Sequence, residues 1–199
     1  MKSIFRFLST AAVCAAFAVS VYAKTAEIGQ PAPDFTLTDI DGKSYTLSEL
    51  KGKTVVLEWT NPECPIVGRH YETGNIPALQ KEATADGVVW LAINSGSKGA
   101  QGDFEPAQVK SWLAEKHAVP TAYFRDQDGK IGKMYGAKTT PHMYVINKDG
   151  VLVYAGGIDN NRKTHIGAEN YVRDALTALK TGQPIAKSSA EPYGCSVKY

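Results

Sequence analysis

Cys64 is the residue of this sequence best placed to do covalent chemistry. It follows an apolar run over 54–59 that predicts a buried strand, and it precedes a helical stretch that continues to Lys81. A thiol at a helix N-terminus faces unpaired amide hydrogens and the positive end of the helix dipole, which favour the thiolate. Pro65 suits the first helical turn, whereas Glu63 opposes ionisation by charge repulsion. We predict that Cys64 is a nucleophile; the alternative is an inert, half-buried cysteine.

Glu58 is an acid within an otherwise apolar strand, six residues before Cys64. Burial of a carboxyl raises its pKa toward neutrality, which suits a general base. The alternative is a glutamate at the edge of a sheet, exposed to solvent.

Cys195 is the second cysteine that a mature protein would retain, and it lies in a glycine-flanked segment beyond the last predicted helix. A flexible tail of this kind would allow it to reach Cys64 as a resolving thiol. If the two pair, the loop of more than a hundred residues implies about 5 kcal/mol of restriction of the unfolded state. Catalytic pairing, a static bridge and no pairing all remain open on two cysteines alone.

Histidines offer a weaker possibility, a soft metal site. Cysteine and histidine ligands suit Cu(I) or zinc, so Cys64 could bind such an ion together with His70 or His142. For both histidines we favour a surface position without a metal role. No cofactor is predicted.

The remaining pattern predicts one α/β domain with a mixed sheet flanked by helices, because strands alternate with helices before a closing antiparallel pair. Pro77 is expected to divide the helical stretch after Cys64, and the glycine-rich segment 95–103 is expected to be a mobile loop. The other predicted elements are an N-terminal hairpin over 34–38 and 45–47, strands over 88–94 and 121–124, a helix over 106–116, a hairpin over 143–146 and 151–154, and a helix over 171–180.

Residues 1–23 have the pattern of a cleavable signal peptide, with basic residues, an apolar run and small residues before the cleavage site. The third cysteine, Cys14, lies inside this segment. We expect a domain over 24–185, followed by a tail over 186–199 that carries Cys195, in the periplasm or outside the cell. Disulfides persist in such compartments.

The net charge of the chain is carried by the predicted signal peptide. Without its Lys2 and Arg6, the protein has equal numbers of acidic and basic side chains. It therefore lacks the basic field that attracts nucleic acid, and it has no basic amphipathic stretch for a membrane surface. We expect neither as a partner after cleavage of the signal.

Thr140 and Pro141 directly precede the strand predicted over 143–146, and a proline that enters a strand is often preceded by a cis peptide bond. With Cys64 and the order of the strands, this motif resembles the thioredoxin superfamily. The closest resemblance is to peroxiredoxin-like redoxins of the alkyl hydroperoxide reductase/thiol-specific antioxidant group. The motifs that carry it are Gly-Gln-Pro-Ala-Pro-Asp-Phe at 29–35, Val-Val-Leu-Glu-Trp at 55–59, Asn-Pro-Glu-Cys-Pro at 61–65, Tyr-Gly-Ala at 135–137 and Thr-Thr-Pro-His at 139–142.

The resemblance implies a thioredoxin-like fold with an N-terminal β-hairpin extension and a redox-active Cys64. It also implies that Glu58 lies beneath the active site and moves protons, and that Pro141, Thr140 and Trp59 line a substrate groove. Partners would be a protein thiol or disulfide, or a small-molecule thiol reductant.

Two positions depart from the family patterns. Val67 replaces the second cysteine of the thioredoxin CxxC motif, so a disulfide within the helical turn is impossible. Asn61 stands where peroxiredoxins carry the hydroxyl that binds peroxide, and Leu57 where they carry a proline.

These departures favour exported thiol–disulfide exchange, or weak antioxidant activity, over efficient peroxide reduction. The alternative is a binding protein that has lost turnover, either a copper carrier or a peptide-binding module.

Overall fold

A six-stranded mixed sheet forms the centre of the protein in the computed structural model, which describes residues 25–162 and 169–199. Its strand order is β5-β4-β3-β7-β8-β9. Strands β3, β4 and β5 are parallel, and β7 runs antiparallel to both β3 and β8. The sheet is therefore mixed, as the sequence predicted.

The elements follow one another along the chain in the order expected for alternating strands and helices. They are β1 (Thr36–Thr38), β2 (Ser44–Thr46), the 3-10 helix η1 (Leu47–Leu50), β3 (Val55–Trp59), α1 (Pro65–Glu72), α2 (Asn75–Ala85), β4 (Val89–Asn94), α3 (Pro106–Glu115), β5 (Ala122–Arg125), α4 (Lys130–Tyr135), β6 (Thr139–Thr140), β7 (His142–Ile146), β8 (Leu152–Gly156), α5 (Tyr171–Thr181), β9 (Ser189–Ala190) and β10 (Cys195–Ser196).

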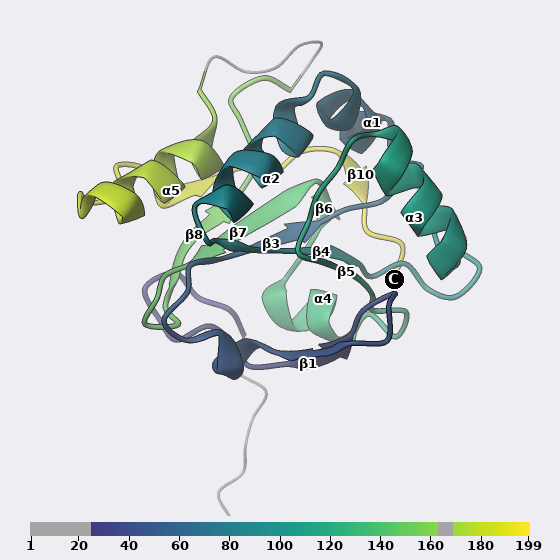
Figure 1. Ribbon diagram of the computed structural model, residues 1–199, viewed down its shortest axis with the longest axis horizontal. Coiled ribbons are helices and arrows are strands. Elements are labelled where there is room, and N and C mark those ends of the chain that lie inside the picture. The colour runs from purple at the N-terminus through teal and green to yellow at the C-terminus, as the bar shows by residue number, and fades with distance from the viewer. Residues whose placement is uncertain (1–24, 163–168) are drawn as a thin grey trace, which may run out of the picture.

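Both faces of the sheet are covered. Helices α1, α2, α3 and α5 lie on one face, and α4 with the hairpin β1–β2 lies on the other (Figure 1). Every residue of β3 and β4 is buried, as expected for strands in the centre of a two-sided core. The two hydrophobic clusters meet across these strands: Val56 belongs to the helical side and Leu57 to the opposite side.

The helical stretch after Cys64 is divided at Gly74, not at Pro77 as predicted. Gly74 has a φ of 75°, in the left-handed region that glycine adopts readily, and it precedes α2 directly. Pro77 lies in the first turn of α2, where a missing amide hydrogen costs little. Helix α4, which was not predicted from the sequence, begins directly after Gly129 and has only six residues.

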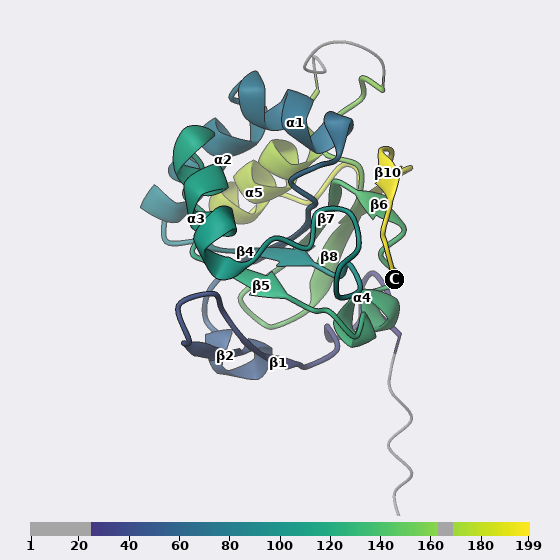
Figure 2. The same ribbon diagram turned by 90° about the vertical axis from the view of Figure 1, so that its right-hand side faces the viewer.

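The segment after α5 packs against the domain. Strand β9 pairs in parallel with β8 at the edge of the central sheet, and β10 pairs with β6 in a separate two-stranded sheet. Both views show β10, in yellow, beside β6, with the C-terminus near α4 (Figures 1 and 2). No helix among the described residues is long and apolar enough to span a membrane.

Candidate active site around Cys64 and Cys195

Cys64 caps the N-terminus of α1, and Pro65 occupies the first position of that helix. A short loop from β3 leads to it, and the amide of Cys64 donates to the carbonyl of Asn61 at 3.0 Å. The context predicted from the sequence is therefore present. Cys64 is only 1% exposed, because the C-terminal segment lies over it and bonds to its sulfur.

Cys64 and Cys195 form a disulfide with Cα atoms 5.9 Å apart, within the usual range for such bonds. Of the three alternatives left open by the cysteine count, the structure therefore excludes an unpaired Cys195. Strand β10 is positioned by antiparallel pairing with β6, which places Cys195 opposite Thr140. The sulfur of Cys64 lies 3.2 Å from the carbonyl oxygen of Thr140.

Gly194 allows this close approach of two backbones. Its φ is 140°, and a Cβ atom at this position would lie 1.9 Å from the carbonyl oxygen of Thr140. Only glycine fits, so the residue before Cys195 is determined by the contact between β10 and β6.

The peptide bond between Thr140 and Pro141 is cis, as the sequence motif predicted. Both residues are buried beside the disulfide, beneath the pairing of β10 with β6. Trp59 is placed differently from the predicted groove residue: it is completely buried in the hydrophobic cluster on the side of the sheet opposite Cys64. Its indole nitrogen donates to the hydroxyl of Ser95 at 2.9 Å.

Glu58 is completely buried, which excludes the exposed edge position. Its carboxylate accepts hydrogen bonds from Tyr71 at 2.6 Å, Trp90 at 2.7 Å and Gln80 at 3.0 Å. Burial raises the pKa of Glu58, and these three donors offset part of that rise. Tyr71 belongs to α1, the helix that begins after Cys64, so the carboxyl is linked to that helix by one side chain.

The side chain of Asn61 holds the loop that carries Cys64. Its carbonyl oxygen accepts from the amide of Glu63 at 2.9 Å, and its amide donates to the carbonyl of Gln101 at 3.1 Å. The carboxylate of Glu63 in turn accepts from the amide of Gly102 at 2.5 Å. Segment 95–103, predicted as a mobile loop, is thus irregular in structure but tied to the loop that carries Cys64.

Val67 is completely buried in the hydrophobic cluster above the sheet. It therefore packs where a CxxC motif would place its second sulfur, and Cys195 supplies the disulfide partner from the far end of the chain.

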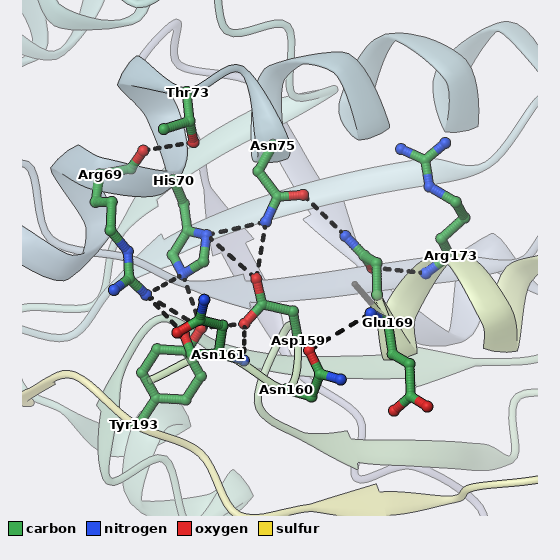
Figure 3. Close-up of polar contacts among 11 residues, drawn as sticks. Arg69, His70, Thr73, Asn75, Asp159, Asn160, Asn161, Glu169, Arg173 and Tyr193 are labelled. Atoms are coloured by element: carbon green, nitrogen blue, oxygen red, sulfur yellow. Dashed lines mark hydrogen bonds and ion pairs between the residues drawn. The ribbon is translucent and has the colours of Figure 1, made fainter. Parts of the chain in front are cut away.

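His70 is completely buried, which corrects the predicted surface position. Figure 3 shows its ring between α1 and the segment after β8. Its Nδ1 accepts from Asn75 at 2.9 Å and lies 4.0 Å from the carboxylate of Asp159, and its Nε2 lies 3.1 Å from the hydroxyl of Tyr193. Burial lowers the pKa of His70 to about 4, so the ring is neutral near pH 7.

Tyr193 links this polar cluster to the segment that carries the Cys64–Cys195 disulfide. Its hydroxyl donates to Asp159 and accepts from Arg69 at 3.3 Å. We define the Tyr193 anchor as His70, Asp159 and Arg69 together with Tyr193. It holds the chain two residues before Cys195. The sequence reading missed it, and the only signal was a tyrosine close to a cysteine in a segment that looked flexible.

His142 is also buried, again contrary to the predicted surface position. Its Nδ1 accepts from the amide of Lys138 at 3.3 Å and lies 3.2 Å from the hydroxyl of Tyr144. Burial, with a smaller contribution from the charge of Lys138, lowers the pKa of His142 to about 4. Within residues 25–162 and 169–199, no group of three or more His, Cys, Asp or Glu side chains is arranged to hold a metal ion.

Comparison with known proteins agrees with this geometry. The family model described as AhpC/TSA matches residues 28–155. Thiol-disulfide oxidoreductase ResA of Geobacillus thermodenitrificans is 30% identical over 144 residues, which cover 68% of this chain and 76% of that protein. Chloroplastic peroxiredoxin Q of Populus jackii is 31% identical over 143 residues, covering 67% and 61%. The crystal structure of an uncharacterized conserved protein from Geobacillus kaustophilus has a TM-score of 0.78 at 29% identity, covering 87% of this chain and 92% of that one.

Proposed function

This chain belongs to the AhpC/TSA family of redoxins and has the thioredoxin-like fold that its motifs predicted, and on that premise we propose that it is an exported thiol–disulfide oxidoreductase that uses Cys64 and Cys195 as its redox pair. The observation that carries the proposal is the disulfide between a cysteine at a helix N-terminus and a cysteine on a strand paired beside a cis-proline.

Reduction of the disulfide begins at Cys195. Cys195 is a partly exposed residue, whereas Cys64 is 1% exposed, so we expect an external thiolate to attack the sulfur of Cys195 first. A mixed disulfide forms on Cys195, and Cys64 leaves as a thiolate at the N-terminus of α1, where amide hydrogens stabilise it. A second thiolate then attacks the external sulfur and releases Cys195.

Oxidation of the reduced protein runs through Cys64. Its thiolate attacks the disulfide of a partner, and one partner sulfur leaves as thiolate. Cys195 then attacks the sulfur of Cys64, restores the internal disulfide and releases the other partner thiol. Cys195 must lose its proton in this step, and we assign Glu58 as the buried proton acceptor. It lies on the same face of β3 as Val56, which packs in one cluster with Cys64.

Disulfides rather than peroxides are the preferred oxidants in this proposal. The side chain of Asn61 is committed to two loop hydrogen bonds, and it carries no hydroxyl to bind a peroxide. The partner is a protein disulfide or a small-molecule thiol, and the chemistry needs no cofactor.

Export is part of the proposal and rests on the signal-peptide pattern of residues 1–23, which lie outside the described residues. Residues 24–185 then form the redoxin domain. Residues 186–199 provide the resolving segment, and in an oxidising compartment the disulfide is its resting state.

Mass spectrometry of the reduced protein after challenge tests the proposal. Glutathione disulfide is expected to convert the protein to the Cys64–Cys195 form, and Cys195→Ser is expected to accumulate a glutathione adduct on Cys64. Cys64→Ser is the matched control and should react much more slowly. Two free thiols after challenge, or bridges between molecules alone, would refute the redox pair.

Hydrogen peroxide should oxidise the protein more slowly than glutathione disulfide at equal concentration.

A further inference from the structure

The last residues of the chain bind to the domain as an extended peptide would. Beyond the pairing of β10 with β6, the amide of Val197 donates to the carbonyl of Lys138 at 3.1 Å. The carbonyl of Lys198 accepts from the amide of Ser97 at 2.7 Å. These contacts use backbone atoms, so they place few demands on the sequence of the bound strand.

Three side chains of this strand contact the domain. Val197 packs, partly buried, against the hydrophobic cluster that contains Trp59. Cys195 is bonded through its sulfur, and the hydroxyl of Tyr199 donates to the carbonyl of Ala137 at 2.8 Å. We call the surface under the Tyr199 ring the tyrosine seat and define it by Gly129, Gly132 and the carbonyl of Ala137. Tyr199 is four residues after Cys195.

The glycines of the tyrosine seat leave room for the bound ring. A Cβ atom on Gly129 would lie 2.5 Å from Cδ1 of Tyr199, and one on Gly132 would lie 2.6 Å from its hydroxyl. Gly132 lies inside α4, where glycine costs about 1 kcal/mol relative to alanine. A Cβ on Gly132 would also lie 2.6 Å from the hydroxyl of Ser95, so this glycine serves two close contacts.

The bound strand must leave before Cys64 can act on another molecule, because Cys64 is 1% exposed beneath it. Its departure exposes the free edge of β6, the amide of Ser97 and the tyrosine seat together. The vacated surface is then complementary, in shape and in hydrogen-bonding groups, to an extended segment. That segment would have a cysteine at one end and an aromatic ring four residues later.

We infer that the tyrosine seat is a substrate subsite, which selects extended polypeptides with an aromatic residue, preferably tyrosine, four positions after the cysteine that Cys64 attacks. This inference rests on the proposed thiol–disulfide exchange and adds a substrate class to it. Tyr199 as a whole residue is 43% exposed, so we expect the selectivity of the seat to be moderate.

The reaction at this subsite is thiol–disulfide exchange. The thiolate of Cys64 attacks the peptide sulfur of a peptide–glutathione disulfide, the bond between peptide and Cys64 forms, and glutathione leaves as thiolate. No further oxidant is consumed. The peptide then occupies the place of residues 194–199.

A peptide series on the full-length protein tests the inference. The reference peptide is Gly-Cys-Ser-Val-Lys-Tyr as its glutathione disulfide, and the comparison peptides carry phenylalanine or alanine at the last position. A fourth peptide, Gly-Cys-Ser-Val-Tyr-Lys, moves the ring by one residue, which turns it to the other side of an extended strand. The protein is reduced Cys195→Ser with Tyr199→Ala, which keeps Cys64 and empties the seat.

We expect the tyrosine peptide to react about fivefold faster than the alanine peptide, since a ring contact and a hydrogen bond contribute this much together. Phenylalanine should be intermediate, and the shifted peptide should match alanine. Each rate is divided by the rate of the same variant with glutathione disulfide alone. Gly132→Ala in this background should reduce the ratio of tyrosine to alanine toward one.

Equal rates for all four peptides, with normal reaction of glutathione disulfide, would overturn the subsite and leave the proposed function standing. No reaction with glutathione disulfide or any peptide would overturn both. If Gly132→Ala fails to fold, the four peptides on the parent protein still decide the question.

Discussion

Tyr193 donates a hydrogen bond to Asp159 (Figure 3). Tyr193 lies two residues before Cys195, the cysteine bonded to Cys64. Asp159 follows β8, whereas Tyr193 lies beyond α5, so two distant segments are joined beside the disulfide. We therefore expect the Tyr193 anchor to set how often a released Cys195 meets Cys64.

Tyr193→Phe keeps the ring and removes the hydroxyl. We expect it to lower the effective concentration of Cys195 at Cys64 about tenfold, because a hydrogen bond to a buried charged group contributes on this scale. Equilibration with glutathione buffers, followed by quantification of the two redox forms, measures this. Tyr45→Phe in the hairpin β1–β2 is the matched control and should leave the equilibrium unchanged. An unchanged equilibrium in Tyr193→Phe would show that the anchor does not position Cys195.

The disulfide should stabilise the domain. It closes a loop with a sequence separation of 131 residues, which corresponds to at most about 5 kcal/mol of unfolded-state restriction. Urea unfolding of the oxidised wild type, the reduced wild type and Cys195→Ser measures this loss. We expect the last two to be equally destabilised relative to the first. Equal stability of all three proteins would contradict a structural contribution from the bridge.

His142 should make the protein less stable in mild acid. Its pKa is about 4 in the folded state, whereas the ordinary value is 6.5. Between these values the unfolded chain is protonated and the folded ring is not. The free energy of unfolding therefore falls as pH decreases from 6.5 to 4, and is constant for this group above that window. The full effect is about 3 kcal/mol.

His142→Gln tests this directly, because glutamine does not titrate. Urea titrations at pH 7, 5.5 and 4 should show a smaller acid loss of stability in the variant than in the wild type. An identical pH slope in both proteins would mean that another group, such as His70, accounts for all of the loss.

Glu58 should have the opposite pH dependence. Its pKa is raised above 4.5 in the folded state by burial, so above pH 4.5 the unfolded chain loses its proton before the folded one does. The stability of the wild type relative to Glu58→Gln should then fall as pH rises through the folded pKa. Differences in the free energy of unfolding over pH 4 to 8 measure this, with exposed Glu49→Gln as the control. A difference that does not vary with pH would refute a raised pKa.

The proton-acceptor role of Glu58 predicts a separate kinetic effect. We expect Glu58→Gln to slow closure of the Cys64–Cys195 disulfide from a glutathione adduct on Cys64 by about a hundredfold, the lower end of general base catalysis. Rapid quenching and mass spectrometry follow that step. A purely structural role would change stability but leave the rate of closure, and its pH profile, as in the wild type.

The setting of Cys64 between a buried strand and a helix was predictable from the sequence because its causes are local. An apolar run before the cysteine and a proline after it predict a buried strand and a helix start, and the structure contains β3 and α1 at these places. The cis bond before Pro141 was predictable for the same reason, since residue type and the following strand favour it.

Trp59 was misplaced because its strand is buried on both faces. In a half-exposed strand, alternation of polar and apolar residues reveals which side chains face together, but β3 is almost uniformly apolar. Only the tertiary structure shows that Trp59 lies on the side of the sheet opposite Cys64. The burial of His70 and His142 was equally hidden, because it depends on packing by segments distant in sequence.

The sequence by itself determined the redoxin resemblance, the place of Cys64 between a strand and a helix, and the absence of a second cysteine at position 67, where Val67 stands. The tertiary structure decided that Cys195 is the partner and that its segment is bound rather than flexible. The physical reason is that Tyr193, Cys195 and Tyr199 are bound by groups from distant parts of the chain: Asp159 after β8, Cys64 at the start of α1, and Ala137 after α4. The polar composition of residues 186–199 is that of a flexible linker, and the surface that binds them forms only when distant parts of the chain have folded together.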